Sequence, residues 1–213
     1  EIRHFSYNEI LNKLQERRKY FKNEMMEYYR FLSKTVNVVG SNQDELFRID
    51  RNADGSVLVQ VWTIKKEGPE SLIYQRLFDP EVTKEIRVYG MGEKDSFLLR
   101  GTDNRKIKLR IIGGSGDDVF VNNADGRAGK TIVYDVSYED NVFEGNPLRT
   151  SITGDATNNR YNRLYYNYDL LHPDLGLGFN VDDGLYVGGR IRYTKYGFRK
   201  EPYAQHHDFR LTR

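Results

Sequence analysis

The strongest constraint on this chain is a motif that recurs along it. Three copies consist of a short apolar run, a glycine, four residues, an acid, one residue and a phenylalanine, and they lie at 36–47, 86–97 and 109–120. A fourth copy at 132–143 has Val136 where the glycine is expected and Asn141 where the acid is expected. Positions 95, 118 and 141 are evenly spaced. A period of about 23 residues predicts stacked supersecondary units that bury their apolar faces on one another.

We therefore expect a mainly β fold over 35–145, either a short parallel β-solenoid or a strongly repetitive β-sheet domain. The acids of the first two copies, Glu45 and Asp95, are separated by about two periods, and 59–62 supplies an apolar run where a missing copy would lie. Asp54-Gly55 predicts a hairpin turn in the same region, because this pair favours the positive φ angles of such turns. Local hairpins are thus expected in place of some repeats.

Residues 1–34 predict an amphipathic helix. Ser6 and Glu9 match a capping box, and Phe5 and Ile10 match a hydrophobic staple, which together place the helix start at about residue 7. A stripe with one polar member recurs at alternating steps of four and three residues: Tyr7, Leu11, Leu14, Arg18, Phe21, Met25, Tyr28 and Leu32. An apolar stripe of this kind is buried against another part of the protein or against a partner. We expect the helix to cover an open end of the repeat domain; the alternative is contact with other protein subunits or an upstream domain.

Composition narrows the function classes. With 33 basic and 31 acidic residues the net charge is +2, too small for a field that would attract nucleic acid. Cysteine is absent, which excludes disulfides and thiolate metal sites but fits cytoplasm, periplasm or export equally. The sequence begins with Glu1 and shows neither a signal-peptide core nor an apolar run long enough for a transmembrane helix. We interpret it as a fragment or a processed product.

Calcium is the only cofactor that the residues suggest. The stretch 113–121 matches the G-G-x-G-x-D-x-U-x nonapeptide of calcium-binding β-rolls. Carboxylate and carbonyl oxygens are the ligands that Ca²⁺ prefers, so Asp95, Asp117 and Asp118 are the candidate ligands. A lysine beside Asp95 argues against a fully occupied site. In the alternative interpretation, the glycines form a tight β-arc, Asp118 caps backbone N–H groups and Phe120 fills the core.

Sequence signals for catalysis are weak. Gly129-Lys130-Thr131 resembles the end of a phosphate-binding loop, but Ala124 stands where its first glycine is required and a strand follows it. His206 and His207 are adjacent, and adjacent side chains of a strand point to opposite faces, so they are poorly placed to bind one ion. We expect no enzyme activity in this chain and identify no catalytic residue.

The C-terminal segment alternates strongly. Over 185–194, one face carries Leu185, Val187, Gly189, Ile191 and Tyr193, and the other carries Tyr186, Gly188, Arg190, Arg192 and Thr194. A half-buried strand of a soluble protein has this pattern, and so does a strand of an outer-membrane barrel. In the membrane interpretation, 184–213 is a first transmembrane hairpin that turns at 197–202, and its interfacial aromatic girdle consists of Tyr193, Tyr196, Phe198 and Tyr203.

These segments resemble a known family. The stretch 180–189 followed by 196–203 is similar to the barrel entry of BamA/TamA-like surface-antigen proteins. More narrowly, 85–90 and 111–118 with 131–135 resemble a subgroup in which a calcineurin-like metallophosphoesterase precedes such a barrel. The resemblance implies a role in outer-membrane protein assembly or translocation, with any phosphoesterase upstream of this chain, because the Asp, His and Asn motifs of its metal centre are missing here.

The expected organisation is a helix (1–34), a β-repeat domain (35–145), a linker or barrel entry (146–183) and a first transmembrane hairpin (184–213). The expected function is a periplasm-facing connector or scaffold of an outer-membrane barrel protein, in contact with outer-membrane lipid through 184–213. The main rival is a calcium-binding β-roll module of a secreted protein, which predicts calcium-dependent folding. A third candidate is a polysaccharide-active β-helix enzyme, which predicts a carboxylate groove along one face.

Overall fold

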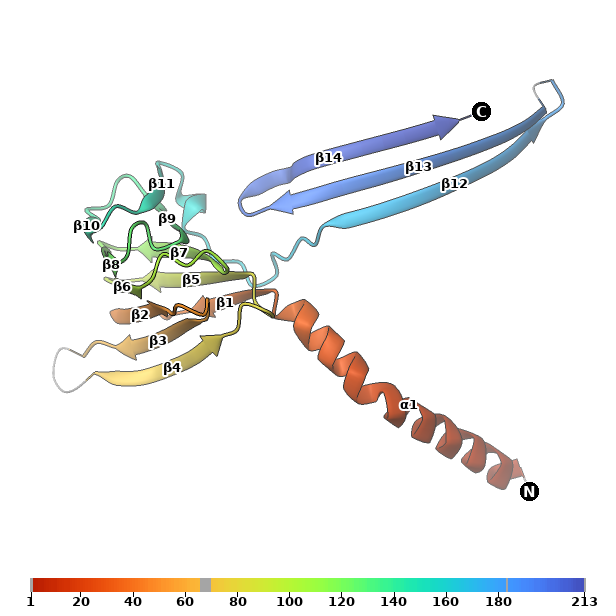
Figure 1. The fold of residues 1–213 in the computed structure, drawn as a ribbon, viewed down its shortest axis with the longest axis horizontal. Coiled ribbons are helices and arrows are strands. Elements are labelled where there is room, and N and C mark those ends of the chain that lie inside the picture. The colour runs from red at the N-terminus through yellow and green to blue at the C-terminus, as the bar shows by residue number, and fades with distance from the viewer. Residues whose placement is uncertain (1, 66–69, 183, 213) are drawn as a thin grey trace. The chain divides into compact units, whose positions relative to one another are not determined.

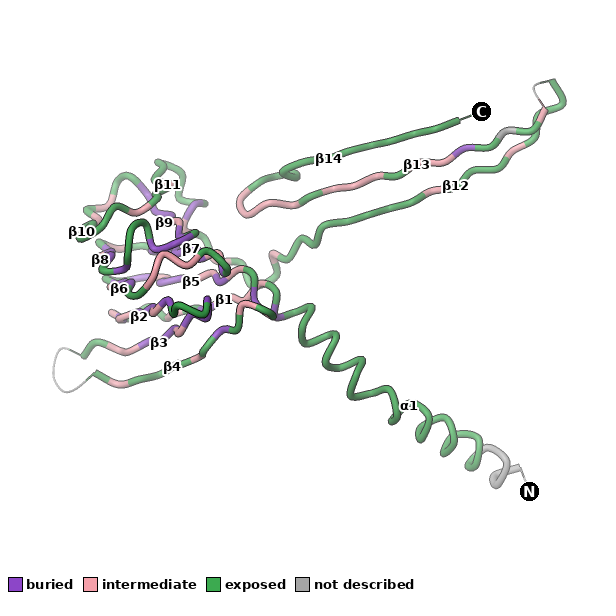
Figure 2. Tube along the Cα trace, viewed as in Figure 1, coloured by how far each residue is buried: buried purple, intermediate pink, exposed green. Residues whose placement is uncertain are grey.

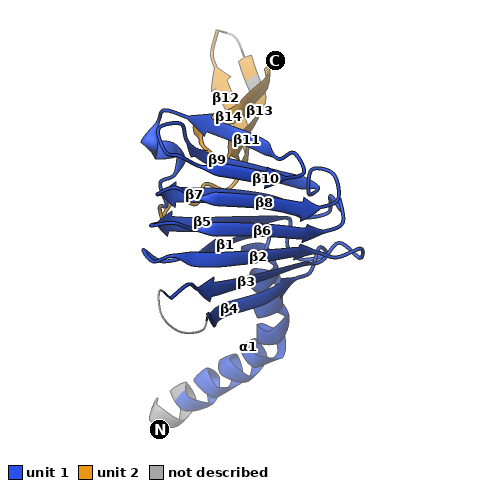
Figure 3. Cartoon of the chain, turned by 90° about the vertical axis from the view of Figure 1, so that its left-hand side faces the viewer, with its two compact units in different colours: residues 1–161 blue, residues 162–213 orange. Residues whose placement is uncertain are grey.

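The computed structural model describes residues 2–65, 70–182 and 184–212. The chain is mainly β, with one N-terminal helix and several sheets that are partly parallel, which confirms the expected class (Figure 1). It divides into two compact units, Glu1–Tyr161 and Asn162–Arg213 (Figure 3).

The first unit contains a five-stranded and a six-stranded sheet. All strands of the five-stranded sheet are parallel, in the order β1 (Thr35–Val39), β5 (Glu85–Gly92), β7 (Lys108–Ser115), β9 (Lys130–Val136) and β11 (Arg149–Thr153). The six-stranded sheet has the order β10 (Val142–Gly145), β8 (Val119–Ala124), β6 (Ser96–Gly101), β2 (Glu45–Arg51), β3 (Val57–Thr63) and β4 (Ser71–Phe78). Its first four strands are parallel, and the last two pairings are antiparallel.

Each copy of the motif contributes one strand to each sheet, so equivalent residues of successive copies stack. The motif phenylalanines pair in register from Phe47 to Phe97, Phe120 and Phe143. Their ring centroids are 4.8, 5.0 and 5.0 Å apart, and the first three rings are fully buried. Valine, isoleucine and leucine side chains from both sheets complete the core, which Figure 2 shows as the buried part of this unit. Each copy of the motif adds one strand beside the equivalent strand of the previous copy. The repeated phenylalanines therefore form a column through the core.

The long gap between the first two copies holds a hairpin, and the prediction of a missing copy at 59–62 is wrong. β2 pairs directly with β6, so no repeat lies between them. The predicted Asp54-Gly55 turn joins β2 to β3, and β4 follows antiparallel to β3. Gly55 has a φ of 97°, the conformation that glycine favours. The hairpin therefore extends the six-stranded sheet beyond β2.

The fourth copy is shifted by one residue in the five-stranded sheet. Ile112 pairs with Tyr134, whereas Phe120 pairs with Phe143, so the offset between partners is one residue shorter in the five-stranded sheet than in the six-stranded one. The residue in register with Gly113 is therefore Asp135, and the assignment of Val136 to the glycine position is wrong. The turn after β9 contains the extra residue.

The N-terminal helix α1 spans Ile2–Leu32, so the predicted start near residue 7 is wrong. The side chains of residues 2–6, and with them the predicted capping box and staple, lie outside the described part of the chain. Every residue from Tyr7 to Leu32 is exposed, as Figure 2 also shows. The apolar stripe therefore does not cover the β-repeat region as expected.

The second unit is a three-stranded antiparallel sheet of β12 (Leu170–Asn180), β13 (Gly184–Gly197) and β14 (Lys200–Thr212). The last two strands form an antiparallel hairpin over the expected residues, with Gly197 paired to Lys200 across the turn. Its place in a membrane stays a prediction. β12 lies in the stretch that was expected to be a linker or barrel entry, so the regular sheet begins one strand earlier than predicted. A short 3₁₀ helix, η1 (Ala156–Asn158), precedes this unit.

Candidate functional sites

The motif acids form a buried column across the six-stranded sheet. The backbone N–H of Glu45 donates to Oδ1 of Asp95 at 2.9 Å, and the N–H of Asp95 donates to Oδ1 of Asp118 at 2.9 Å. The N–H of Asp118 in turn donates to Oδ1 of Asn141 at 2.8 Å. Glu45, Asp95 and Asp118 are at most 1% exposed. The side chains of Asp95 and Asp118 therefore cap the backbone of the preceding copy, and Asn141 makes the same contact with an amide oxygen. Glu45, in the first copy, accepts instead from the N–H of Ser41 at 2.8 Å.

The motif glycine makes room for the acid that follows it in the same copy. A Cβ on Gly90 would collide with the Asp95 carboxylate and with the carbonyl oxygen of Gly113. A Cβ on Gly113 would collide with the carboxylates of Asp118 and Asp135. The glycine and the acid are thus one packing unit, which explains their constant separation in the sequence.

The carboxylates of the column have more oxygen atoms than hydrogen-bond donors to pair with them. Among the residues that the structure describes, the Oδ2 atoms of Asp95, Asp118 and Asp135 are buried without a hydrogen-bond partner. Burial, together with the Asp118 carboxylate, raises the pKa of Asp95 to about 9. Burial likewise raises the pKa of Asp118 to about 7 and that of Asp135 to about 6. A carboxyl group with so high a pKa keeps its proton at neutral pH, so Asp95 is neutral inside the column.

Asp135 was not among the site residues predicted from the sequence. It is fully buried, and Asn159 donates its amide to Asp135 Oδ1 at 2.7 Å. Asn158 donates to the backbone oxygens of Asp135 and Ser151 at 2.7 and 2.8 Å. The one-residue register shift of β9 places Asp135 beside the column, and no sequence pattern signals that shift.

The three candidate calcium ligands do not converge. Asp95 and Asp118 are neighbours in the column, but each commits Oδ1 to a backbone N–H. Asp117 is exposed and accepts instead from the N–H of Asp140 at 3.0 Å. Across the described residues, no group of three or more His, Asp or Glu side chains is arranged to hold a metal ion. Calcium at Asp95, Asp117 and Asp118 stays a prediction, while the capping contacts and the fully buried Phe120 match the architectural interpretation of the motif.

The glycine turn itself supports that interpretation. Gly114 and Gly116 have φ angles of 121° and 133°. The equivalent residues of the preceding copy, Met91 and Glu93, adopt positive φ angles of 92° and 68°. The same arc therefore forms in both copies, with glycine in one and larger residues in the other.

The second unit has two chemically distinct faces. Register pairs Leu175 with Gly189 and Leu177 with Val187, and Ile191 with Phe209 on the same side. Most of these side chains are exposed: Leu175 is 93% exposed and Leu177 is 79% exposed. The apolar face consists of Leu171, Pro173, Leu175, Leu177, Phe179, Leu185, Val187, Ile191, Tyr193, Phe209 and Leu211.

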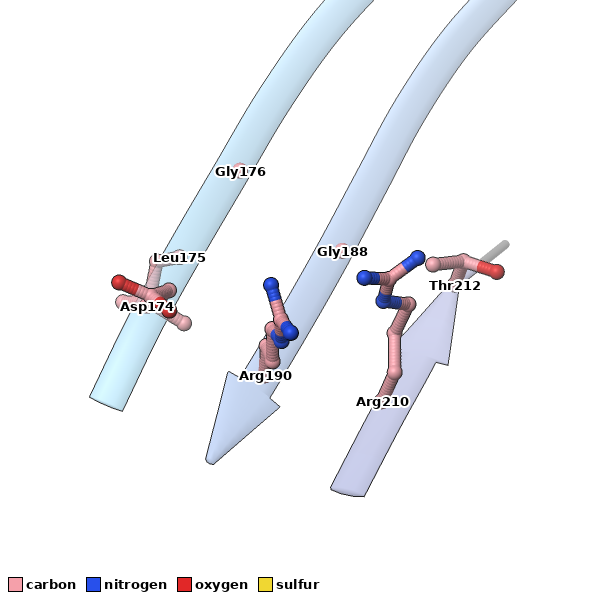
Figure 4. Close-up of a pocket in the computed structure, with 8 residues that line it drawn as sticks. Asp174, Leu175, Gly176, Gly188, Arg190, Arg210 and Thr212 are labelled. Carbon is pink, nitrogen blue, oxygen red and sulfur yellow. The ribbon is translucent and has the colours of Figure 1, made fainter. Parts of the chain in front are cut away.

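The opposite face is polar and carries cross-strand ion pairs. Arg192 Nη2 lies 2.9 Å from Asp174 Oδ2, and Arg190 Nε donates to Asp208 Oδ1 at 2.8 Å. Gly176 pairs with Gly188 in the row next to these ion pairs, and a recess of about 190 Å³ lies there (Figure 4). The recess is lined by Asp174, Leu175, Gly176, Gly188, Gly189, Arg190, Arg210 and Thr212.

The two remaining motifs have structural positions. His206 pairs with Thr194 on the polar face, and His207 pairs with Tyr193 on the apolar face, so the two histidines point apart as expected. Lys130 and Thr131 lie in β9, where Thr131 accepts from Arg51 at 3.1 Å, so no helix follows the Gly-Lys-Thr sequence.

No protein-family model, curated protein or solved structure matches the chain. Within the described residues, no helix is both long and apolar enough to cross a membrane.

Proposed function

We propose that this chain is a connector of an outer-membrane barrel protein. In this proposal, residues 170–212 are consecutive transmembrane strands, and the β-repeat region that precedes them is a short parallel solenoid in the periplasm. The solenoid holds an upstream domain or a partner at the mouth of the barrel.

The observation that carries the proposal is the exposed apolar face of the three-stranded sheet. Contiguous apolar patches of more than a few hundred Å² are rare on soluble proteins and mark surfaces that contact other molecules. Here the apolar face runs through all three strands, and the other face is polar and ion-paired. A strand that contacts lipid on one side and a lumen on the other has this alternation.

Strand length agrees with a membrane crossing. β12, β13 and β14 have 11, 14 and 13 residues. A tilted transmembrane strand needs about 9–11 residues to cross the hydrocarbon core. Each strand is therefore long enough to span it, with residues left over at the interfaces.

Aromatic residues gather at one end of the sheet, where β12 begins and β13 turns into β14. Tyr193, Tyr196, Phe198 and Tyr203, the predicted girdle, flank this turn, and Tyr165, Tyr166 and Tyr168 precede β12. The N–H of Tyr196 donates to Asp169 Oδ1 at 2.8 Å, which joins the two sets. Tyrosine is enriched at membrane interfaces because its ring is apolar and its hydroxyl is polar. The chain would thus enter the membrane through an aromatic interface.

The role in outer-membrane protein assembly or translocation comes from the family resemblance of 180–203. Among the described residues nothing pairs with the outer edges of β12 and β14, and open edges are not stable in lipid. Assembly of a barrel therefore requires further strands from the same protein or from other subunits.

The test is a cysteine scan along β12, which is clean because the chain has no native cysteine. Leu175→Cys, Gly176→Cys, Leu177→Cys and Gly178→Cys are made in the full chain, labelled with NBD and mixed with phosphatidylcholine–phosphatidylglycerol vesicles. We expect blue-shifted emission and quenching by acyl-chain quenchers at 175 and 177, and water-like emission at 176 and 178.

Positions 176 and 178 are matched controls on the same strand. Equal emission at all four positions, with the chain remaining outside the vesicles, would contradict the membrane assignment. If thermal unfolding of the same chain then shifted strongly with calcium, the secreted β-roll module would become the better function.

A further inference from the structure

Helix α1 presents an apolar stripe that no described part of the first unit covers. The stripe defined above runs from Tyr7 to Leu32, and its members Leu14 and Phe21 are 57% and 59% exposed. Elsewhere on the helix, Lys13 Nζ contacts Glu9 Oε1 at 2.6 Å, an ion pair typical of a solvent-facing surface. The helix therefore has one face suited to water and one suited to a partner.

The spacing of the stripe is that of a coiled coil. Steps of four and three alternate without exception from Tyr7 to Leu32, which is the heptad period. In heptad notation, position a contains Leu11, Arg18, Met25 and Leu32, and position d contains Tyr7, Leu14, Phe21 and Tyr28. This pattern predicts an apolar contact surface for a second helix, here called the seam, which consists of the a and d residues.

A parallel pair of two such helices is unfavourable. It would place Arg18 against Arg18 of the second copy at the core, and it would oppose Phe21 to Phe21. Flanking g and e positions would bring Arg17 next to Lys22 of the second copy, a like-charge contact repeated by symmetry. Charge and size thus disfavour the parallel arrangement.

An antiparallel pair is complementary. Each a residue then faces a d residue of the second copy, which pairs Leu14 with Met25 and Arg18 with Phe21. The second contact can form a cation–π interaction. In the g positions, Arg17 would face Glu24 of the second copy, and each of these pairs occurs twice by the twofold symmetry.

The remaining contacts of this arrangement are also favourable. At the ends of the seam, Leu11 faces Tyr28 and Tyr7 faces Leu32. No layer of the seam therefore contains two aromatic rings. Outside the seam, Ile10 faces Phe31, two apolar residues that are 57% and 43% exposed in the single chain.

We propose that α1 is a dimerisation element, and that two copies of this chain associate through an antiparallel coiled coil over residues 7–32.

Disulfide trapping tests the orientation in the full chain, held in non-ionic detergent. Leu14→Cys and Met25→Cys are purified separately and oxidised alone or as a mixture. The proposal predicts cross-linked dimers in the mixture and almost none with either variant alone, because Leu14 and Leu14 of the second copy are offset by about 16 Å along the seam. Efficient cross-linking of Leu14→Cys alone would show a parallel pair and overturn the proposal.

Charge reversal tests the interface by sedimentation equilibrium. Arg17→Glu should weaken the dimer about tenfold, because it would face Glu24, whereas in a parallel pair it would face Lys22 and strengthen association. Glu24→Arg should weaken the dimer equally, and the double variant should restore it. Glu27→Arg, on the solvent face, is the matched control and should change nothing. A monomeric wild-type chain at 100 µM, or a dimer that ignores both reversals, would overturn the proposal.

Discussion

The two units contain strands with similar alternation but bury them very differently. In β2 every second residue is buried, and its core residue Phe47 is fully covered. In β14 every described residue is exposed, although Phe209 and Leu211 alternate with charged residues in the same way. The difference teaches that alternation determines that a strand has two faces, but not what covers the apolar one. In the first unit a second sheet covers it; in the second, the proposed cover is lipid.

The units also differ in how far apart their paired residues are in the sequence. In the repeat region, parallel neighbours come from different copies of the motif, with another strand of the opposite sheet between them in the chain. In the second unit each strand pairs with the next through a short turn. Parallel stacking requires a repeat that keeps its register, and the side chains that keep it are the phenylalanine and acid columns.

The largest effect should come from the phenylalanine column. Phe97→Ala removes a buried ring that stacks on two others, so we expect the first unit to lose about 3–5 kcal/mol of unfolding free energy. Urea denaturation followed by Trp62 fluorescence measures this, because the only tryptophan lies in β3.

The matched control is Phe179→Ala in the second unit, where the ring is 73% exposed. The urea midpoint reported by Trp62 should not change. A similar loss for both variants would show that the two units unfold together and that the contrast between them is wrong.

A smaller loss is expected where the glycine and the acid pack together. Gly90→Ala places a methyl group against the backbone of Gly113 and the Asp95 carboxylate, and overpacking of this kind costs about 1–3 kcal/mol. Gly154→Ala is the control, since its nearest neighbour would be Ser137 Oγ at 3.8 Å. If both substitutions proved neutral in the same urea assay, the glycine would not be needed for the acid column.

The acid column should make stability depend on pH. Asp95 has a pKa of about 9 when folded and an ordinary value of 3.8 when unfolded. Its contribution is fully present below pH 3.8 and is lost as the pH rises towards 9, by about 1.4 kcal/mol per pH unit. Asp118 and Asp135, with pKa values of about 7 and 6, add to the loss at lower pH.

Asp95→Asn should remove the Asp95 share of this loss between about pH 4 and pH 9, and all of the loss above pH 7, where Asp118 and Asp135 no longer add to it. We expect the variant to equal the wild type near pH 4 and to exceed it in urea midpoint at pH 8.5. Asn141, which makes the same capping contact, shows that an amide fits the position. Asp117→Asn, at the exposed neighbouring position, is the control. If the urea midpoint of Asp95→Asn fell with rising pH as steeply as that of the wild type, Asp95 would not be the residue that holds the proton.

The smallest effect should come from the polar face of the second unit. Asp208→Asn breaks the exposed ion pair with Arg190, and exposed pairs contribute little. We expect no measurable change in the urea midpoint reported by Trp62. A clear shift would reveal energetic coupling between the units.

Several features of the fold could be predicted from particular residues. The spacing of Asp95, Asp118 and Asn141 predicted the stacking, Asp54-Gly55 predicted a turn, and the alternation over 185–194 predicted a long two-faced strand. Two features could not be predicted. The long gap between the first two copies suggested a missing repeat but contains a hairpin, and Asp135 joined the acid column only because β9 is shifted by one residue.

The sequence by itself determined the local periods: a heptad stripe in the helix, an alternation of two in the strands and the regular recurrence of the glycine–acid–phenylalanine motif. These follow from side-chain chemistry and backbone geometry, which act over short distances along the chain. The tertiary structure decided which residues of different motif copies contact one another. It placed Asp118 beside Asp95 and Asp135 beside Asp118, and only burial at these contacts converts ordinary carboxylates into a column with raised pKa values.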